Sequence, residues 1–135
     1  MDADQNRTAG TRWQPVSPEV TAASFPKLVE EGEQLAIHFW AEWDRIDRDM
    51  DKNIQSIAPR LKGWVSFYAA DIDRPENVDW CKSLNIVSIP CLLVFVKGQR
   101  TRHIIGLGNE KRLMQEILQG LSDVATKKRP WWKLW

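Results

Sequence analysis

The sequence predicts an α/β fold in which a central mixed β-sheet is flanked by helices on both faces. Segments with helical spacing of apolar residues alternate along the chain with short, almost continuously apolar runs, which are typical of strands covered on both sides. Lys97-Gly98-Gln99 separates the last two of these runs and has the residues of a hairpin turn. The 135 residues, of which 43% are hydrophobic and 27% charged, suit one compact domain.

The elements are predicted in the order helix, strand, helix, strand, helix, strand, strand, helix. The first helix spans residues 22–31 and ends at Gly32. The longest helical stripe runs from Asp44 to Leu61, where five apolar residues follow one another at steps of 4, 4, 3 and 4. Residues 15–20 could add an edge strand. The other helices are expected over residues 76–84 and 110–121, and the strands over residues 35–41, 64–72, 91–96 and 101–105.

The chain divides into three segments. Residues 1–19 show no periodicity and are expected to form a flexible N-terminal arm that Trp13 pins to the domain. Residues 20–122 hold the predicted elements. Residues 123–135 form a tail whose last nine residues carry four positive charges and no acidic side chain, so a formal net charge of +1 leaves −3 for the rest. Three of the eight tryptophans lie in the same nine residues, so this tail needs its own explanation.

Composition excludes several classes of protein. The longest uncharged apolar run, residues 89–96, is eight residues long, against the roughly 20 that a membrane-spanning helix needs. The polar opening MDADQNRTAGTR has no basic region followed by an apolar one, so we expect no secretory signal and a cytoplasmic location. Two cysteines cannot form a disulfide framework, and with two histidines they make a poor zinc site. We expect no metal and no cofactor.

Several motifs, in the right order, resemble those of the thioredoxin family. They comprise the approach to the active site, the end of the following strand, the position of the family's cis-proline, a hairpin and a glycine beyond it. In this chain they read Phe39-Trp-Ala-Glu-Trp43, Asp71-Ile-Asp73, Ser88-Ile-Pro90, Leu92-Leu-Val-Phe95 with Lys97-Gly98, and Gly106. The resemblance covers about residues 20–122 and implies a thioredoxin-like fold with a cis bond between Ile89 and Pro90.

The catalytic motif of that family is missing. Thioredoxins read Trp-Cys-Gly-Pro-Cys-Lys where this chain reads Trp43-Asp-Arg-Ile-Asp47-Arg48. Thiol exchange needs one thiolate to attack a disulfide and a second to resolve the mixed disulfide, and the carboxylates of Asp44 and Asp47 can do neither. The family's buried aspartate, its partner lysine and its helix-kinking proline fall at His38, Ala69 and Lys52. The resemblance therefore implies a redox-inactive relative and no enzyme.

Other roles are open to the residues that replace this motif. Asp44 and Asp47 stand at the start of a helix, where carboxylates cap free N–H groups, so we expect capping rather than recognition or metal binding. His38 would either pair with a carboxylate and stay charged or be a neutral core residue with one hydrogen bond. A metal ion held by Asp44, Asp47, His38 and Cys91 would match no standard ligand spacing.

Cys91 follows the expected cis-proline, so it could lie beside the former active site. We expect both Cys91 and Cys81 to be small buried hydrophobes. The alternative is a thiol–disulfide oxidoreductase, or another thiol-dependent activity, that uses Cys91.

A peptide-binding surface is the property of the family that this chain retains. Trp43, Ile89, Pro90 and Gly106 match the residues that hold an extended peptide in thioredoxins, and they are present although the cysteines are not. We therefore predict a binding or scaffold module that recognises a protein or peptide partner without reacting with it.

The tail predicts a second contact. Cations beside indoles suit an anionic membrane interface, and the same residues suit insertion of tryptophan into a partner protein. Four positive charges on an otherwise negative domain make nucleic acid a poor ligand. We expect docking on a protein, or peripherally on a membrane, rather than folding of the tail onto its own domain. The docking residues are Lys127, Lys128, Arg129, Trp131, Trp132, Lys133 and Trp135.

Overall fold

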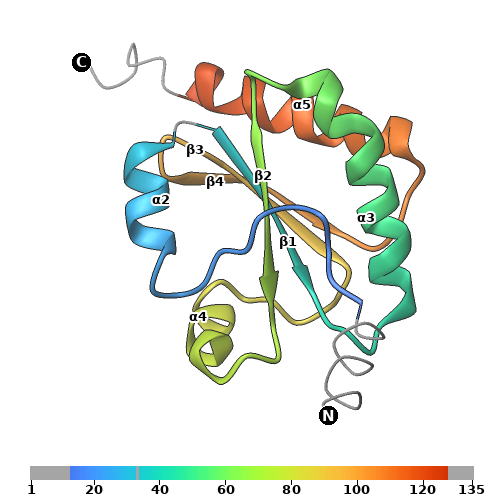
Figure 1. Ribbon diagram of the computed structural model, residues 1–135. Coiled ribbons are helices and arrows are strands. Elements are labelled where there is room, and N and C mark those ends of the chain that lie inside the picture. Colours follow the sequence, from blue (N-terminus) through green and yellow to red (C-terminus); the bar gives the residue numbers. More distant parts are fainter. Residues whose placement is uncertain (1–12, 33, 128–135) are drawn as a thin grey trace.

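A computed structural model of the chain describes residues 13–32 and 34–127, the last five of these by their backbone only. The elements follow the predicted order of helices and strands (Figure 1). They are α2 (Phe25–Glu31), β1 (Gln34–Trp40), α3 (Arg45–Ile57), η1 (Ala58–Leu61), β2 (Ser66–Asp71), η2 (Pro75–Asn77), α4 (Val78–Ser83), β3 (Cys91–Val96), β4 (Gln99–Ile105) and α5 (Glu110–Lys127), where η denotes a 3-10 helix.

The four strands form one mixed sheet in the order β2-β1-β3-β4. β1 runs parallel to β2, with Phe39 opposite Ala70, and antiparallel to β3, with Phe39 opposite Cys91. β3 and β4 form the predicted hairpin, in which Cys91 lies opposite Ile105. Parallel pairing of β1 and β2 brings their carboxyl ends to the same edge of the sheet. The candidate site described below lies at this edge.

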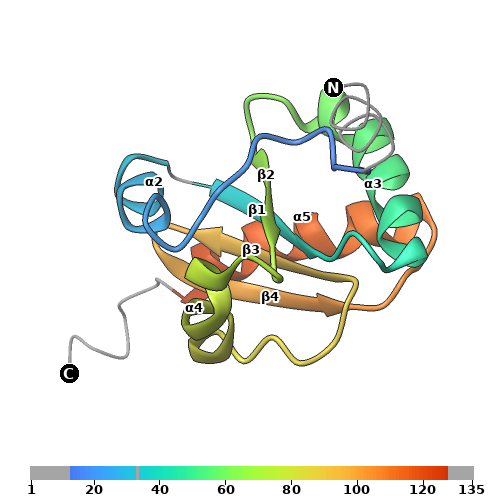
Figure 2. The same ribbon diagram turned by 60° about the horizontal axis from the view of Figure 1, so that its bottom comes forward.

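Helices cover both faces of the sheet, as predicted. α3 and α5 lie on one face, and α2 and α4 lie on the other (Figure 1, Figure 2). Successive side chains of β1 point to opposite faces, so Ala36 joins the core under α3 and α5 while Leu35 and Ile37 join the core under α2 and α4. All strand residues from 35 to 40 and from 91 to 96 are buried, which explains why both runs are apolar except at His38.

Four helix boundaries differ from the predicted ones. The first helix, expected from residue 22, begins at Phe25, because residues 22–24 form a turn. The helix predicted from Asp44 to Leu61 is α-helical only as far as Ile57 and continues as the 3-10 turn η1, because Pro59 has no N–H to donate to the carbonyl four residues earlier. The helix expected over residues 76–84 begins with the 3-10 turn η2. α5 continues six residues past Leu121, through a stretch without Gly or Pro that lacks an apolar stripe. The expected tail boundary at residue 123 therefore falls inside a helix.

The described part of the N-terminal arm is attached to the sheet. Ala69 in β2 donates its N–H to the carbonyl of Pro18 over 2.8 Å and accepts from the N–H of Val20 over 2.9 Å. Trp13 packs edge-on against Trp40, with 5.3 Å between the ring centroids, which confirms that Trp13 pins the arm. The end of the arm is therefore paired with the outer edge of β2, which offers free backbone groups. Closer to Trp13 the arm reaches Trp40 and α3 instead, where the N–H of Val16 donates to Oδ1 of Asp51 over 3.3 Å, so the described part of the expected flexible arm is held to the domain.

The helices in the described part of the chain include none that is long and apolar enough to cross a membrane.

Candidate functional site

The loops at the carboxyl ends of β1 and β2 are joined by a tryptophan. Trp43 lies between β1 and α3, and its indole Nε1 donates to the Oδ2 atom of Asp73, in the loop after β2, over 2.7 Å. The Trp43 side chain remains 65% exposed, so one ring is held in place and still offers its surface to solvent. Asp73 is not among the predicted site residues, although its position as a carboxylate just after the neighbouring parallel strand is a signal that could have indicated its role.

The loop before β3 reaches the same edge of the sheet. The bond between Ile89 and Pro90 is cis, as predicted. The carbonyl of Pro90 accepts from the N–H of Gly106 over 2.9 Å, so the turn after β4 is tied to the proline loop. Gly106 has a φ of 86°, in the left-handed region that favours glycine, and a Cβ atom there would meet nothing within 4 Å. Trp43, Pro90 and Gly106 thus flank the carboxyl end of β1.

Apolar side chains next to these residues in the sequence are exposed to solvent. They come from the start of α3, the loop before β3, the end of β4 and the turn that follows it. The exposed fractions are 46% for Ile46, 78% for Val87, 47% for Ile105 and 41% for Leu107. Because surface apolar residues gathered around exposed backbone favour contact with an extended chain, this edge has the character of a binding surface.

Asp47 does not cap the helix, which corrects the expectation from the sequence. Its side chain is fully buried and points back toward β1, where Oδ1 lies 3.0 Å from Nε2 of His38 and Oδ2 accepts from the N–H of Ala41 over 2.9 Å. Helical spacing from Asp44 turns this residue inward under the end of β1, so it bridges strand, loop and helix. Burial raises the pKa of the Asp47 carboxyl above its ordinary value, and the hydrogen bonds from His38 and Ala41 oppose that shift.

His38 is paired with this carboxylate, and the geometry decides between its two expected states. A charged imidazole ring needs a partner for both of its N–H groups. The Nδ1 atom of His38 is buried and has no hydrogen-bond partner among the described residues. A neutral ring whose single proton sits on Nε2 and is donated to Asp47 satisfies this arrangement best.

Asp44 behaves as predicted. It is the N-cap residue of α3, with an extended backbone, and its Oδ1 atom accepts from the N–H of Ile46 over 3.2 Å. The two carboxylates that replace the family's cysteines therefore have different tasks: one caps a helix at the surface, and the other ties together the inside of the site.

Both cysteines are buried, as predicted. Cys91 is fully buried in the core under α2 and α4, on the face of the sheet opposite to His38, because its partner in the register is Phe39. It follows the cis-proline along the chain, but its side chain points away from Asp47. Burial raises the pKa of the Cys91 thiol to about 12 and also raises the pKa of Cys81.

A metal ion has no obvious ligands in this part of the molecule. Among the side chains that the structure describes, no three of His, Cys, Asp or Glu lie close enough together to hold one. The proposed set of Asp44, Asp47, His38 and Cys91 is divided by the sheet, because Cys91 lies on the other face from His38.

The tail residues cannot be placed in this site. Lys127 ends α5, and its side chain is outside the description. Lys128, Arg129, Trp131, Trp132, Lys133 and Trp135 lie outside the described residues.

Comparison with known proteins identifies the family. The sequence model of the Thioredoxin family matches residues 16–119. A thioredoxin of Staphylococcus aureus is 30% identical over 99 residues, which are 73% of this chain and 92% of that protein.

Solved structures agree on the fold. The oxidized mitochondrial thioredoxin 3 of Saccharomyces cerevisiae superposes with a TM-score of 0.68 at 24% identity, over 76% of this chain and 94% of its own. A chain from work on thiol resolution in yeast mitochondrial 1-Cys peroxiredoxin, through the glutathione and thioredoxin systems, has the same TM-score and identity over 77% and 95%. Because the family model spans more than half of the chain and a thioredoxin is 30% identical over most of its own length, this chain belongs to the thioredoxin family.

Proposed function

We propose that this chain is a thioredoxin-family binding module without dithiol chemistry. Its surface around Trp43, Ile89, Pro90 and Gly106, which we call the peptide groove, would take an extended stretch of a protein or peptide partner and release it unchanged. The observation that carries the proposal is the buried bridge of Asp47 to His38 and Ala41. Asp47 stands where the family has a reactive cysteine, and its carboxylate holds strand, loop and helix together instead of reacting.

This site lacks the two thiols that dithiol exchange requires. Asp44 and Asp47 have no sulfur to attack a disulfide or to resolve one. A thiol reacts as its thiolate, and a pKa of about 12 leaves Cys91 almost entirely protonated at neutral pH. Its burial also keeps a disulfide of another protein from reaching the sulfur.

The groove is supported by exposed apolar surface beside rigid backbone. Trp43 is anchored through Asp73 and still exposes most of its ring, so it can contact a partner with little loss of conformational entropy. The hydrogen bond from Gly106 to Pro90 holds two loops together, and the open space over Gly106 lets another backbone approach. Extended peptides are typically held by such main-chain groups, with adjacent apolar side chains adding specificity.

The tail adds a second contact to this proposal. Residues 127–135 combine four cations with three tryptophans, which suits either a protein partner or an anionic membrane surface. The tail would then attach the domain to a protein or to a membrane, while the groove selects the peptide that is bound.

The alternative function is a thiol–disulfide oxidoreductase or another thiol-dependent activity that uses Cys91. It is favoured by the relatives, which are named thioredoxins. An insulin-reduction assay with dithiothreitol separates the two functions, with a thioredoxin that has both cysteines as positive control. We expect no turnover above the uncatalysed rate. Activity that disappears in Cys91→Ser would replace the binding proposal with the thiol one.

The groove itself is tested with peptides selected from a random library on the full-length protein. Trp43→Ala should weaken their binding about tenfold, because an exposed anchored tryptophan is a typical hot spot. Trp64→Ala is the matched control: Trp64 is 63% exposed, close to the 65% of Trp43, but it precedes β2 and so lies at the opposite end of the sheet. Equal losses in the two variants, or a loss only in Trp64→Ala, would contradict a groove beside Trp43.

A further inference from the structure

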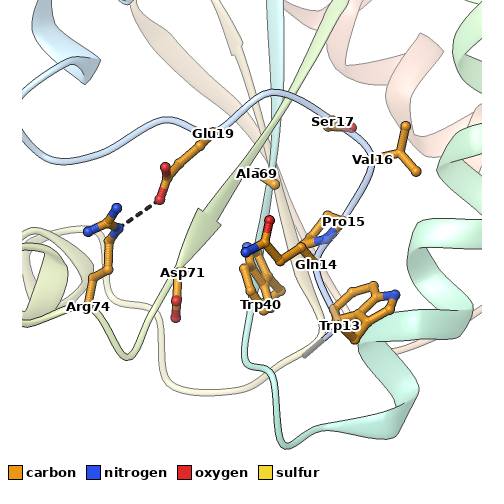
Figure 3. A pocket seen from close by; sticks show the side chains of 10 residues that line it. All are labelled: Trp13, Gln14, Pro15, Val16, Ser17, Glu19, Trp40, Ala69, Asp71 and Arg74. Carbon is orange, nitrogen blue, oxygen red and sulfur yellow. Dashed lines mark hydrogen bonds and ion pairs between the residues drawn. The ribbon is translucent and has the colours of Figure 1, made fainter. Parts of the chain in front are cut away.

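A cavity of about 540 Å³ lies under the N-terminal segment, at the carboxyl ends of the parallel strands β1 and β2 (Figure 3). The segment from Trp13 to Glu19 forms one wall, and the last residues of β1 and β2 form the other. The cavity exists because the arm is docked on β2 and crosses in front of the sheet. It is separate from the surface around Pro90 and Gly106, since neither residue lines it.

The size and place of this cavity are those of a ligand site. Pockets for small ligands measure roughly 300–1,000 Å³. In α/β sheets, ligands commonly bind just beyond the carboxyl ends of parallel strands. Trp40 and Asp71, which end β1 and β2, both line this cavity.

The charges around the cavity favour a cation. Arg74 is held by Glu19, with 2.7 Å between Nε and Oε2, so these two charges largely cancel (Figure 3). The carboxylate of Asp71 remains. Its Oδ1 atom accepts from the N–H of Asp73 over 2.8 Å, and its Oδ2 atom has no hydrogen bond within the described part of the chain. The lining therefore carries one uncompensated negative charge.

The aromatic lining favours a planar cation. Trp13 and Trp40 meet edge to face, and both contribute to the cavity. The guanidinium carbon of Arg48, which does not line the cavity, already lies 5.8 Å from the ring centroid of Trp13. Guanidinium groups stack on indoles and lose less hydration than ammonium groups when they do so.

We propose that this cavity binds a guanidinium group, with Asp71 as its carboxylate partner and the indoles of Trp13 and Trp40 beside it. A carboxylate or phosphate is disfavoured, because the only cation among the described lining residues, Arg74, is paired with Glu19 and Glu76. The site does not depend on the peptide groove, and either can exist without the other.

The test uses two small probes on the full-length protein labelled with ¹⁵N. N-acetylarginine amide carries the guanidinium, and N-acetylcitrulline amide has nearly the same shape without the charge. We expect the arginine probe to shift the indole N–H resonances of Trp13 and Trp40, and the citrulline probe to bind at least about tenfold more weakly. Binding of the arginine probe should also weaken as salt rises.

Two variants test whether Asp71 is the carboxylate that pairs with the guanidinium group. Asp71→Asn keeps an oxygen for the N–H of Asp73 and removes the charge, and it should weaken binding of the arginine probe about tenfold. Asp79→Asn, an exposed residue of α4 that does not line the cavity, should leave binding unchanged. A short peptide with arginine at its centre shows the source of the group: tighter binding than the single residue assigns it to a polypeptide, and equal binding to a free molecule.

Three results would overturn the proposal. Equal affinity for the two probes would show that charge is not recognised. Resonance shifts that avoid Trp13 and Trp40 would place the probe elsewhere, a result that needs no variant. Tighter binding of N-acetylglutamate amide than of the arginine probe would show that the cavity prefers an anion. Failure of the peptide-groove proposal would show in a different experiment, in which Trp43→Ala would not weaken binding of the selected peptides.

Discussion

The Nε2 atom of His38 lies 3.0 Å from the Oδ1 atom of Asp47, and both side chains are fully buried. This pair connects β1 with the first turn of α3, and the second oxygen of Asp47 extends the connection to the N–H of Ala41. The loop that carries Trp43 is therefore held from inside the domain by Asp47 and from outside by Asp73. The loop that carries the exposed ring of Trp43 is thus held in part by a buried carboxylate.

Truncation of Asp47 should cost more stability than truncation of Asp44. Asp47→Ala leaves the N–H groups of His38 and Ala41 buried without an acceptor, which costs about 3 kcal/mol in the free energy of unfolding. Asp44→Ala removes only an N-cap bond at the surface, which costs about 1 kcal/mol. Urea denaturation at pH 7 measures both. Equal losses would mean that the buried pair contributes no more than a cap.

Asp47 should also leave a signature in the pH dependence of stability. Burial raises its pKa in the folded protein above the ordinary 3.8, so the folded state binds this proton more tightly than the unfolded state. The stability from this group is present below pH 3.8 and is lost as pH rises through the folded pKa. The Asp47→Asn side chain has no carboxyl group to titrate, so this variant does not lose stability in this way as the pH rises.

The stability of Asp47→Asn relative to wild type should therefore increase between pH 3 and pH 7, as measured by urea midpoints across that range. Other carboxylates titrate in both proteins and cancel in the difference. A relative stability that decreases over the same range would mean that His38 and Ala41 lower the pKa of Asp47 instead.

The two thiols should react slowly in the folded protein. Burial raises the pKa of both Cys81 and Cys91, and Cys91 is enclosed between β1 and the helices of its face. Ellman's reagent should therefore label native protein far more slowly than protein unfolded in urea, where both thiols should react. Rapid labelling of one thiol in native protein, absent in Cys91→Ser, would mean that Cys91 is accessible.

Truncation after Lys127 should remove binding through the tail without destabilising the fold. This deletion keeps α5 whole, so the melting temperature should change by no more than a few degrees, while binding to anionic vesicles or to a protein partner should be lost. Replacing Lys128, Arg129 and Lys133 by Gln should weaken vesicle binding strongly and a tryptophan-anchored protein contact less. Unfolding of the truncated chain would mean that the tail tryptophans belong to the core.

The sequence by itself determined the order of elements and the family. Apolar residues at a period of 3.6 identify α3 and α5, and continuous apolar runs identify β1 and β3, because each pattern follows from how many faces an element buries. Local chemistry also predicted the cap at Asp44, since capping involves neighbours in the chain. The cis bond before Pro90 was inferred from the family resemblance and confirmed by the structure.

Only the tertiary structure decided which side chains meet across elements. His38 and Asp47 are separated by a strand end, a loop and a helix start, and nothing in their spacing shows that the helix turns Asp47 inward. The face of Cys91 depends on its register with Phe39, and a shift of one residue would have turned the thiol toward Asp47. The docking of Trp13 against Trp40 follows from the open edge of β2, which exists only once the strand order is set.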